Sequence, residues 1–447
     1  MSLSAQLAAR AAAGRPITVG LIGAGKFGSM FLAMAERQPG IHVAAIADLS
    51  PDGVRRNLAR IGWPAERAAA RDLEEALATG GTWLTEDALA LCDPRIEVVV
   101  EATGHASHGL RHAAAAIAAG RHVVMANVEA DVLAGPVLAA RAERAGVVYS
   151  MAYGDQPALI CELVDILRTH GFPVVAAGKG TKYLPAYHDS TPETVWTHYG
   201  LTPEQAAAGG MNARMFNSFL DGTKSAIEMA AVANATGLAA PEDGLLFPPG
   251  GTADLPHLLR PCAVGGVLER AGMVEVVSSL HRDGSPVEND LRWGVYAVFE
   301  GESDYIRRCF AEYGVATDAS GRYAALWRPY HLIGFELPLS VATVALRREA
   351  TGCPTAWRAD VVAIAKRDLS PGEVLDGEGG AMVWGRCIPA ARSRALDALP
   401  IGLAQGLRLL CPVRRGAMLT RADVLIDPAD PAVALREELV RGFTAPG

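Results

Sequence analysis

The chain has 447 residues, of which half are hydrophobic and a fifth are charged, and its formal net charge is −8. That length suits two or three domains, and interspersed charges on an acidic chain argue against nucleic acid as a partner. There is no run of about 18 apolar residues, so no membrane span is expected.

Cysteine usage and the N-terminus indicate the compartment. The seven cysteines are an odd number without a Cys-x-x-Cys spacing, which argues against a disulfide framework or a zinc ribbon and favours a reducing compartment. The alanine-rich N-terminus lacks the basic start and long apolar run of a secretory signal. We therefore expect a cytoplasmic protein.

Residues 1–155 alternate short apolar runs with helical segments, which predicts a parallel sheet with helices on both faces. The expected strands are 17–22, 41–47, 96–101, 122–126 and 147–151, and the expected helices are 29–37, 51–61, 107–119 and 133–145. Residues 62–91 are expected to form a helical insertion. The predicted fold class is α/β, with an N-terminal Rossmann domain that has a doubly wound parallel sheet.

A glycine-rich turn follows the first expected strand and opens a helix, which is the context of a dinucleotide-binding loop. Gly23 permits the tight turn, Gly25 lets the backbone approach a pyrophosphate, and Gly28 lets the helix pack closely on the strand. Lys26 and Phe27 complete this loop. We predict that these five residues bind the cofactor.

Asp48 ends the second expected strand, about 20 residues after the loop, where a carboxylate accepts hydrogen bonds from the adenosine ribose. A carboxylate there repels a 2′-phosphate, so NAD is favoured over NADP. Arg55 and Arg56 follow on the next helix and leave NADP open.

Two later turns fall beside the expected nicotinamide half of the cofactor. Thr103 and Gly104 follow the strand 96–101, and Asn127 and Glu129 follow the strand 122–126. Because sites in open α/β sheets form beyond the carboxyl ends of the strands, we predict that these four residues bind the cofactor. Asp131 is instead expected to cap a helix.

The pattern changes after residue 155 to that of an α+β substrate domain over 156–327, which we also expect to mediate oligomerisation. The expected elements are a helix 158–169, a strand 173–177, a loop 181–210, a helix 215–236 and two antiparallel strands, 273–280 and 293–299. A helix over 330–346 is expected to return to the first domain. After a linker, the tail 358–447 has short apolar segments typical of a small β-rich domain.

Five polar residues of the middle segment are candidates for catalysis. Lys179 lies between two glycines after a strand, where it could bind an anion or donate a proton; a solvated loop lysine is the alternative. Asp221, Lys224 and Glu228 are close together, and Lys224 and Glu228 share a helix face. An exposed salt bridge is the alternative there. Asp155 is equally a candidate for catalysis or for helix capping.

Two more candidates precede the returning helix. Arg328 could clamp a carboxylate or phosphate, and His331 could transfer protons. Structural roles for both stay open.

The same segments resemble one protein family. The turn 20–25 and the segments 124–131, 177–180, 221–238 and 328–332 are similar to those of reductoisomerase-like proteins related to homoserine dehydrogenase. Some members convert 1-deoxy-D-xylulose 5-phosphate to 2-C-methyl-D-erythritol 4-phosphate. The tail from about Val361 resembles the SAF module that those proteins carry.

The resemblance implies a nicotinamide cofactor, a phosphosugar-like substrate, a divalent metal (Mg or Mn) and a homo-oligomer. By motif, it places Lys179, Asp221, Lys224, Glu228, Arg328 and His331 at the family's site. Asp155 would be the metal ligand. Two departures stand against a full match: Gln156 replaces a glutamate of the family pattern, and Asp48 stands where NADPH-dependent members lack an acid.

Three hypotheses follow. The first is an NAD(P)-dependent oxidoreductase, and within that a reductoisomerase, acting on a small polyhydroxylated or phosphorylated substrate. The second is an alcohol dehydrogenase without a carbon shift, similar to homoserine dehydrogenase, with Lys224 or Lys179 as proton shuttle. The third is a nicotinamide-binding protein whose catalytic positions have decayed, which Gln156 alone favours.

Overall fold

The computed structural model describes residues 2–442, and the chain divides into two compact units. Within the described residues, unit 1 comprises 2–159, 332–355 and 434–439, and unit 2 comprises 160–331, 356–433 and 440–442. The tail from 356 to 433 thus shares a unit with the middle segment. The three domain boundaries expected from the sequence stay predictions.

Unit 1 contains a six-stranded sheet in the order β3-β2-β1-β4-β5-β6, and every pairing in it is parallel. This order is that of the Rossmann fold, so the predicted fold class is confirmed. The strands are β1 (Ile17–Ile22), β2 (Ile41–Ala47), β3 (Trp83–Thr85), β4 (Val98–Glu101), β5 (His122–Met125) and β6 (Tyr149–Met151). Strand β3 was not predicted: it is a short edge strand within the expected helical insertion.

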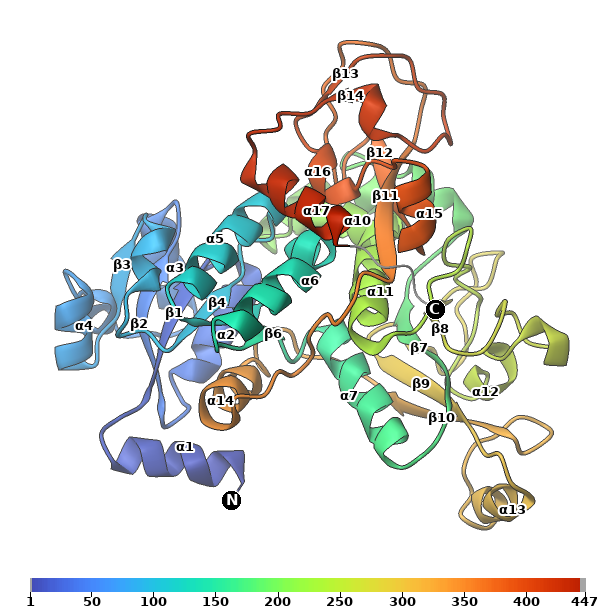
Figure 1. Ribbon diagram of the computed structural model, residues 1–447, viewed down its shortest axis with the longest axis horizontal. Helices are drawn as coiled ribbons and strands as arrows, with labels where there is room; N and C mark the ends of the chain where they lie inside the picture. Colours follow the sequence, from blue (N-terminus) through green and yellow to red (C-terminus); the bar gives the residue numbers. More distant parts are fainter. Residues whose placement is uncertain (1, 443–447) are drawn as a thin grey trace. The chain divides into compact units, whose positions relative to one another are not determined.

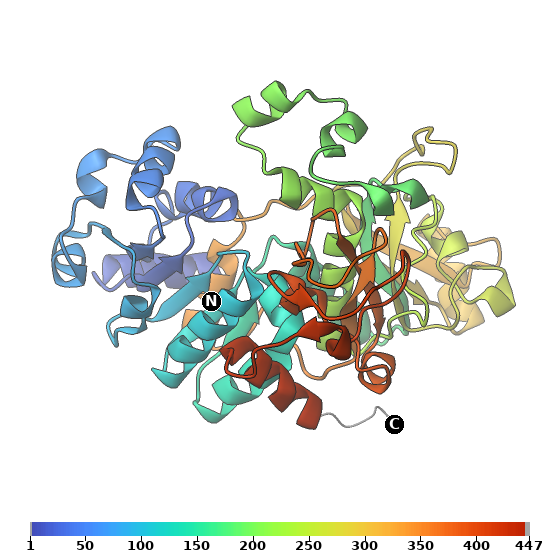
Figure 2. The same cartoon turned by 90° about the horizontal axis from the view of Figure 1, so that it is seen from above.

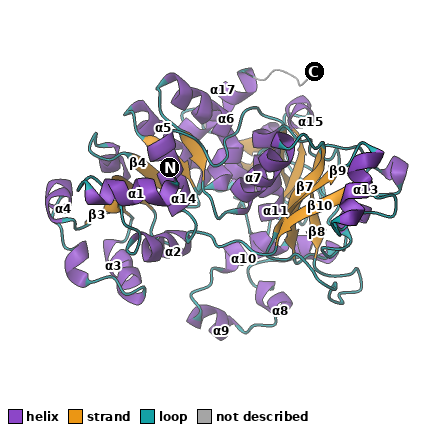
Figure 3. Cartoon of the chain, turned by 90° about the horizontal axis from the view of Figure 1, so that it is seen from below, coloured by secondary structure: helices purple, strands orange, loops and turns teal. Residues whose placement is uncertain are grey.

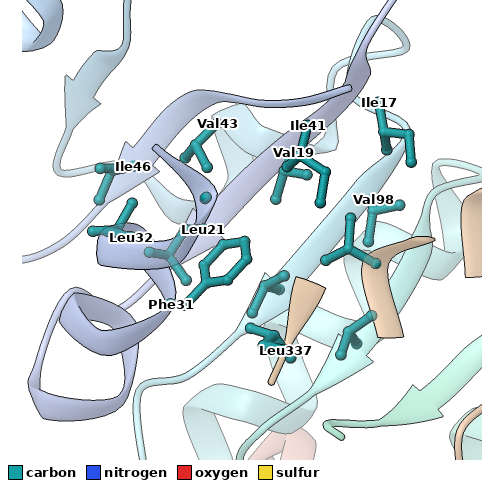
Figure 4. Packing of buried hydrophobic residues seen from close by; sticks show 14 of the residues in the cluster. Ile17, Val19, Leu21, Phe31, Leu32, Ile41, Val43, Ile46, Val98 and Leu337 are labelled. Atoms are coloured by element: carbon teal, nitrogen blue, oxygen red, sulfur yellow. The ribbon is translucent and has the colours of Figure 1, made fainter. Parts of the chain in front are cut away.

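The helices of unit 1 follow the predicted alternation. They are α1 (Leu3–Ala12), α2 (Lys26–Ala35), α3 (Pro51–Arg60), α4 (Leu73–Thr79), α5 (Ala106–Ala118), α6 (Val128–Arg144) and α14 (Pro338–Arg347). The first core cluster joins β1 and α2 through Leu21 and Phe31, and Leu337, the N-cap residue of α14, also belongs to it (Figure 4). Val341 of α14 belongs to the same cluster. The returning helix therefore exists, but it begins at Pro338 rather than at 330.

Unit 2 contains a mixed four-stranded sheet in the order β10-β9-β7-β8 (Figure 1). Its strands are β7 (Val174–Thr181), β8 (Met273–Ser278), β9 (Val295–Glu300) and β10 (Tyr323–Arg328). β8 pairs with β7 in parallel, whereas β9 is antiparallel to both β7 and β10. The predicted antiparallel pairing of the segment 273–280 is therefore wrong, since alternation alone does not reveal the direction of a partner strand.

The other elements of unit 2 are mostly helices and two small hairpins. They are α8 (Val195–Tyr199), α9 (Pro203–Ala208), α10 (Ala213–Leu220), α11 (Thr223–Thr236), α12 (Leu255–Leu258), α13 (Asp304–Glu312), β11 (Ala359–Ala365), β12 (Val383–Pro389), α15 (Ala390–Ala395), α16 (Ile401–Ala404), β13 (Arg408–Leu409) and β14 (Val424–Leu425). α7 (Gln156–Thr169) and α17 (Pro431–Arg441) have residues in both units. The tail is rich in short strands, as predicted.

Two expectations about residues 181–236 need correction. The expected loop 181–210 contains α8 and α9, which project from the rest of unit 2 (Figures 2 and 3). The expected single helix 215–236 is two helices, α10 and α11, because Gly222 takes the left-handed φ of +88° and breaks the chain's helical path.

Within the described residues, 2–442, no helix is long and apolar enough to cross a membrane.

Asp131 does not cap a helix, contrary to expectation. The side chain of Asn127 caps α6 by accepting from the Ala130 amide, and Asp131 is buried one turn into that helix. The Tyr149 hydroxyl donates to Asp131 Oδ1 over 2.8 Å. Burial raises the pKa of Asp131 to about 7, against the opposing effect of that hydrogen bond.

This carboxyl should make stability depend on pH. The folded chain keeps a proton on Asp131 that the unfolded chain releases near pH 4, so the free energy of unfolding falls as pH rises from about 4 to 7. We expect Asp131→Asn to gain roughly 2–3 kcal/mol relative to the natural chain between pH 5 and pH 8 in urea unfolding. The exposed Glu66→Gln is the control, and an equal pH response in both variants would contradict the assignment.

Candidate functional site

The loop between β1 and α2 is shaped for a pyrophosphate. Gly23 has a φ of +91°, and Gly25 is the N-cap of α2 with no side chain capping that helix. A Cβ on Gly28 would lie 2.4 Å from the Gly23 carbonyl oxygen, so only glycine lets α2 pack on the turn. A Cβ on Gly25 would meet no atom within 4 Å. The uncapped amides of α2 therefore face open space, which suits a diphosphate.

Asp48 follows β2 beside this loop. Its Oδ2 accepts from the Ala24 amide over 2.9 Å, and its Oδ1 accepts from the Ser50 amide over 3.0 Å. The carboxylate thus fixes the glycine loop, and its other lone pairs can accept from ribose hydroxyls. Arg55 forms an ion pair with Asp52 on the surface of α3.

The other predicted cofactor residues follow β4 and β5, whose carboxyl ends lie at the same sheet edge as those of β1 and β2. The Thr103 hydroxyl donates to Glu101 Oε1 over 2.5 Å, and Asn127 Nδ2 donates to the His105 carbonyl over 3.1 Å. Glu129 lies in the first turn of α6, and Gly104 has a φ of +71°. The structure brings all these segments to one edge, and their contact with a cofactor stays a prediction.

In unit 2, Lys179 and Glu228 meet as a buried ion pair between strand β7 and helix α11. The Lys179 ammonium donates to Glu228 Oε2, and the two side chains are 6% and 4% exposed. Neither alternative from the sequence therefore holds: Lys179 is no solvated loop lysine, and Glu228 is not part of an exposed salt bridge. Lys224 lies one turn before Glu228 and is half-buried.

Lys179 was expected in a loop because glycines flank it, yet it lies within β7. A Cβ on Gly178 would lie 1.7 Å from the Glu275 carbonyl oxygen, and one on Gly180 would lie 2.0 Å from that of Leu291. These glycines allow close approach of neighbouring backbones rather than a turn. Tyr296 covers Gly178 and donates to the Glu275 carbonyl over 2.7 Å.

Asp221 pairs with a residue of the tail. The Lys366 ammonium donates to Asp221 Oδ2 over 2.7 Å, and Asp221 Oδ1 accepts from the Thr223 amide over 2.9 Å. Asp221 is fully buried, and this burial raises its pKa while Lys366 opposes the shift. The structure thus separates the roles of two residues that the sequence motif places seven positions apart: Asp221 bonds to Lys366, and Glu228 bonds to Lys179.

Arg328 lies in the same row of the sheet as Lys179. Val295 of β9 is in register with Lys179 of β7 on one side and with Arg328 of β10 on the other. Residues directly opposite share a face, so Lys179 and Arg328 lie on one face, and their Cα positions are about 10 Å apart, which is two strand spacings. His331 follows β10, and its Nδ1 bonds the Trp293 carbonyl over 2.7 Å.

Two further cations at this end of the sheet were missed from the sequence. Lys182 and Arg292 lie 5.3 and 5.9 Å from the ring centre of Tyr199. Burial lowers the pKa of Lys182, and the neighbouring Arg292 adds to the shift. Within the described chain, neither forms a salt bridge with an acid. Such an uncompensated pair favours an anionic ligand.

A hydrogen-bonded pair also escaped prediction. Tyr183 Oη and His188 Nε2 are 2.8 Å apart, and His188 Nδ1 bonds the Asp221 carbonyl over 2.7 Å. The His188 ring stacks on Trp384 of β12 with centroids 3.8 Å apart. Burial lowers the pKa of His188 to about 4, so its ring is neutral at pH 7 with a proton on Nδ1.

One signal in the sequence could have found several of these residues. Only five of the 41 lysines and arginines are lysines: Lys26, Lys179, Lys182, Lys224 and Lys366. One lies in the nucleotide loop and the other four lie in unit 2 near the groups just described. In a chain that otherwise uses arginine, a lysine marks a position that needs a compact ammonium.

The metal site predicted from the sequence depends on Asp155. Over residues 2–442, no group of three or more histidines, cysteines, aspartates and glutamates could hold an ion. Asp155, the predicted ligand, begins α7 and accepts from the Gln156 amide over 2.9 Å. An N-cap side chain accepts from an amide two or three residues farther on, so the capping and metal-ligand alternatives for Asp155 both stay predictions. A divalent ion stays a prediction from the sequence, and we assign no step to one.

One protein-family model matches the middle segment of the chain. A family model described as the catalytic domain of oxidoreductase DRL matches residues 154–337, which include Lys179, Glu228 and Arg328. The Rossmann unit precedes this matched segment along the chain. No curated protein matches the chain.

Several solved structures share part of the fold. An NAD-binding oxidoreductase from Klebsiella pneumoniae is 23% identical over 39% of this chain and 45% of its own, with a TM-score of 0.28. A DOX-P reductoisomerase in complex with magnesium is 17% identical over 48% and 56%, with a TM-score of 0.32. Levoglucosan dehydrogenase in complex with NADH and levoglucosan is 15% identical over 70% and 66%, with a TM-score of 0.32. The chain spans less than half of the Klebsiella protein. Such partial similarities carry no information about the substrate of this chain.

Two glycine variants test the nucleotide loop. Gly25→Ala should leave thermal stability unchanged, because its Cβ meets no protein atom, but should weaken NADH binding at least tenfold by occupying the space for the pyrophosphate. Gly28→Ala should lower both stability and affinity, because its Cβ clashes with the Gly23 carbonyl. Fluorescence titration with NADH and thermal unfolding measure the two effects. Unchanged affinity in Gly25→Ala would move the pyrophosphate away from this loop.

Proposed function

We propose that the chain is a dehydrogenase that uses NAD in preference to NADP and acts on a small polyhydroxylated or phosphorylated substrate without a carbon shift. The observation that carries this proposal is the buried Lys179–Glu228 pair, which lies in one sheet row with Arg328. Gln156 in place of the family's glutamate and Asp48 where NADPH-dependent members lack an acid favour this over the reductoisomerase alternative. A cytoplasmic location and a homo-oligomeric state remain part of the proposal.

The bound nicotinamide supplies or accepts a hydride at the carbon that bears the reacting oxygen. The oxygen then needs a proton in reduction and must lose one in oxidation. A lysine ammonium is suited to this exchange, and Glu228 holds the Lys179 ammonium in place. Lys224, one turn away on α11, is the other lysine that could carry the proton.

The cations at the end of the sheet support an anionic group on the substrate. Arg328, Lys182 and Arg292 lie at the end where β7 and β10 terminate and β9 begins. Arginine binds carboxylates and phosphates through paired donors. Lys179 and Arg328 come from strands two apart on one face of the sheet, which suits a substrate that has its reacting carbon and its anionic end at different points along that face.

Cofactor choice can be tested at Asp48. The natural chain should bind NADH more tightly than NADPH, because the carboxylate repels the 2′-phosphate. Asp48→Asn should reduce that ratio about tenfold, the size of one lost charge contact. The control is Asp52→Asn, on the exposed side of α3. Tighter binding of NADPH by the natural chain would refute the preference.

Turnover should be sought with a panel of sugar acids, hydroxy acids and sugar phosphates with NAD(H), alongside deoxyxylulose phosphate with NADPH and manganese. Lys179→Met should then lower kcat roughly 10²–10⁴-fold with NADH affinity unchanged, the range of a lost proton donor. Lys224→Ala should act similarly if it carries the proton. Arg168→Met, which removes only a contact with the Thr236 carbonyl, is the matched control.

The outcomes separate the hypotheses. Loss of Glu228's partner leaves a buried charge, so Lys179→Met combined with Glu228→Leu should regain stability without regaining turnover. Turnover of deoxyxylulose phosphate would restore the reductoisomerase alternative. No turnover with tight NADH binding would favour the decayed protein. Full activity in both Lys179→Met and Lys224→Ala would show that neither lysine takes part in the reaction.

A further inference from the structure

Helix α11 is enclosed on nearly all sides. Of its 14 residues, 11 are buried, and they include small, apolar and polar side chains. The helix contacts β7 and β8 of the mixed sheet and also β11 and β12 of the tail (Figure 1). A helix buried on every face takes its position from its neighbours rather than from one apolar stripe. The tail is therefore one of the neighbours that determine the position of α11.

One residue of the tail makes several hydrogen bonds near the start of the helix. Lys366, the first residue after β11, is 6% exposed. Its ammonium donates to three oxygens: Asp221 Oδ2, the Ser190 carbonyl and the Gly380 carbonyl, each over 2.7 Å. All three protons of the ammonium are thus used. A planar guanidinium cannot reproduce this arrangement.

The tail also bonds to both ends of α11. Near the first turn, the Gly385 amide of β12 donates to Thr223 Oγ1 over 2.8 Å. At the last turn, Asn234 Oδ1 accepts from the amides of Arg358 and Ala359 over 2.7 and 2.9 Å. These contacts belong to one continuous piece of tail. The helix that carries Glu228 is therefore clamped along its length by residues 358–385.

A loop of the tail secures the preceding helix in the same way. Asn217 Nδ2 of α10 donates to the carbonyls of Gly379 and Gly380 over 3.0 and 3.2 Å, and the Ser218 hydroxyl donates to Glu378 Oε1 over 2.5 Å. A Cβ on Gly379 would lie 2.0 Å from the Arg214 carbonyl oxygen. Asp221 is the C-cap residue of α10, so this loop and Lys366 both fix the turn between α10 and α11.

We propose that Lys366 is a positioning residue for the Lys179–Glu228 pair. We also propose that the tail is a structural part of the catalytic unit rather than a separable module. Lys366 acts by holding Asp221, from which α11 departs after the break at Gly222. Glu228 lies seven residues farther on, about 10 Å along the helix. A displacement of Asp221 therefore changes where Glu228 meets Lys179.

The consequence of losing Lys366 follows from its surroundings. Asp221 would keep only hydrogen bonds from Thr223, through its amide and its side chain, and a buried carboxylate without its cation must take up a proton or move toward solvent. Gly222, with its left-handed φ, offers little resistance to such a movement. The neighbouring Arg367 is a matched control, because its exposed guanidinium bonds Glu373 and the Asp368 carbonyl only.

The scarcity of lysine makes a direct test practical. A full chain labelled with ¹⁵N-lysine has five side-chain ammonium groups to observe, and single substitutions assign them. In Lys366→Met the Lys179 signal should shift, and its protons should exchange with water at least tenfold faster. Unchanged NADH binding by unit 1 should show that the fold persists. Arg367→Met should leave the Lys179 signal unchanged.

An unchanged Lys179 signal in Lys366→Met, with NADH still bound, would overturn the proposal. If Lys366→Met does not fold, Asp221→Asn, which keeps the size of the side chain, decides by the same measurement. Once a substrate is known, Lys366→Met should lower kcat at least tenfold without changing the KM for NADH, whereas a general loss of folded protein would lower activity and NADH capacity together.

The role of Lys179 in this inference rests on the proposed function, but the two can fail separately. A displaced Lys179 signal combined with full turnover in Lys179→Met would sustain the link from Lys366 and refute the proposed chemistry. An undisturbed signal combined with an inactive Lys179→Met would sustain the chemistry and refute the link.

Discussion

The arrangement of unit 2 depends on one buried ion pair, between the Lys179 ammonium on a sheet strand and the Glu228 carboxylate on an enclosed helix. Burying either charge alone costs several kcal/mol, so each fixes the position of the other. The glycines on both sides of Lys179 let neighbouring backbones approach, which places the lysine inside the sheet. The Asp221–Lys366 pair repeats the principle at the start of the same helix.

Unit 1 follows a simpler rule that the sequence shows well. Its buried strands, its glycine loop and the acid after β2 are local patterns, so the Rossmann sheet and the order of its loops were predictable. The edge strand β3 escaped because three half-buried residues carry no period. Asp131 was misassigned to a cap, since its burial against Tyr149 depends on contacts between distant segments.

Unit 2 was harder to predict because its site is made by long-range pairing. The motif residues Lys179 and Glu228 were recognised individually, but their pairing across 49 positions was not. Lys366 was missed for the same reason, since its partners Ser190 and Asp221 come from another part of the chain. The sequence does carry one indication of these positions, because it uses arginine almost everywhere else. Four of its five lysines lie near the polar groups of unit 2 described above.

The central claim is that Lys179 is a charged ammonium held out of water by Glu228. Exchange of its protons with solvent, observed in the ¹⁵N spectrum of the unmodified lysine-labelled chain at pH 7 and 25 °C, tests this most directly. The account predicts a visible, slowly exchanging Lys179 signal that is lost in Glu228→Gln. A Lys179 signal erased by fast exchange in the natural chain, as for a lysine in solvent, would contradict it.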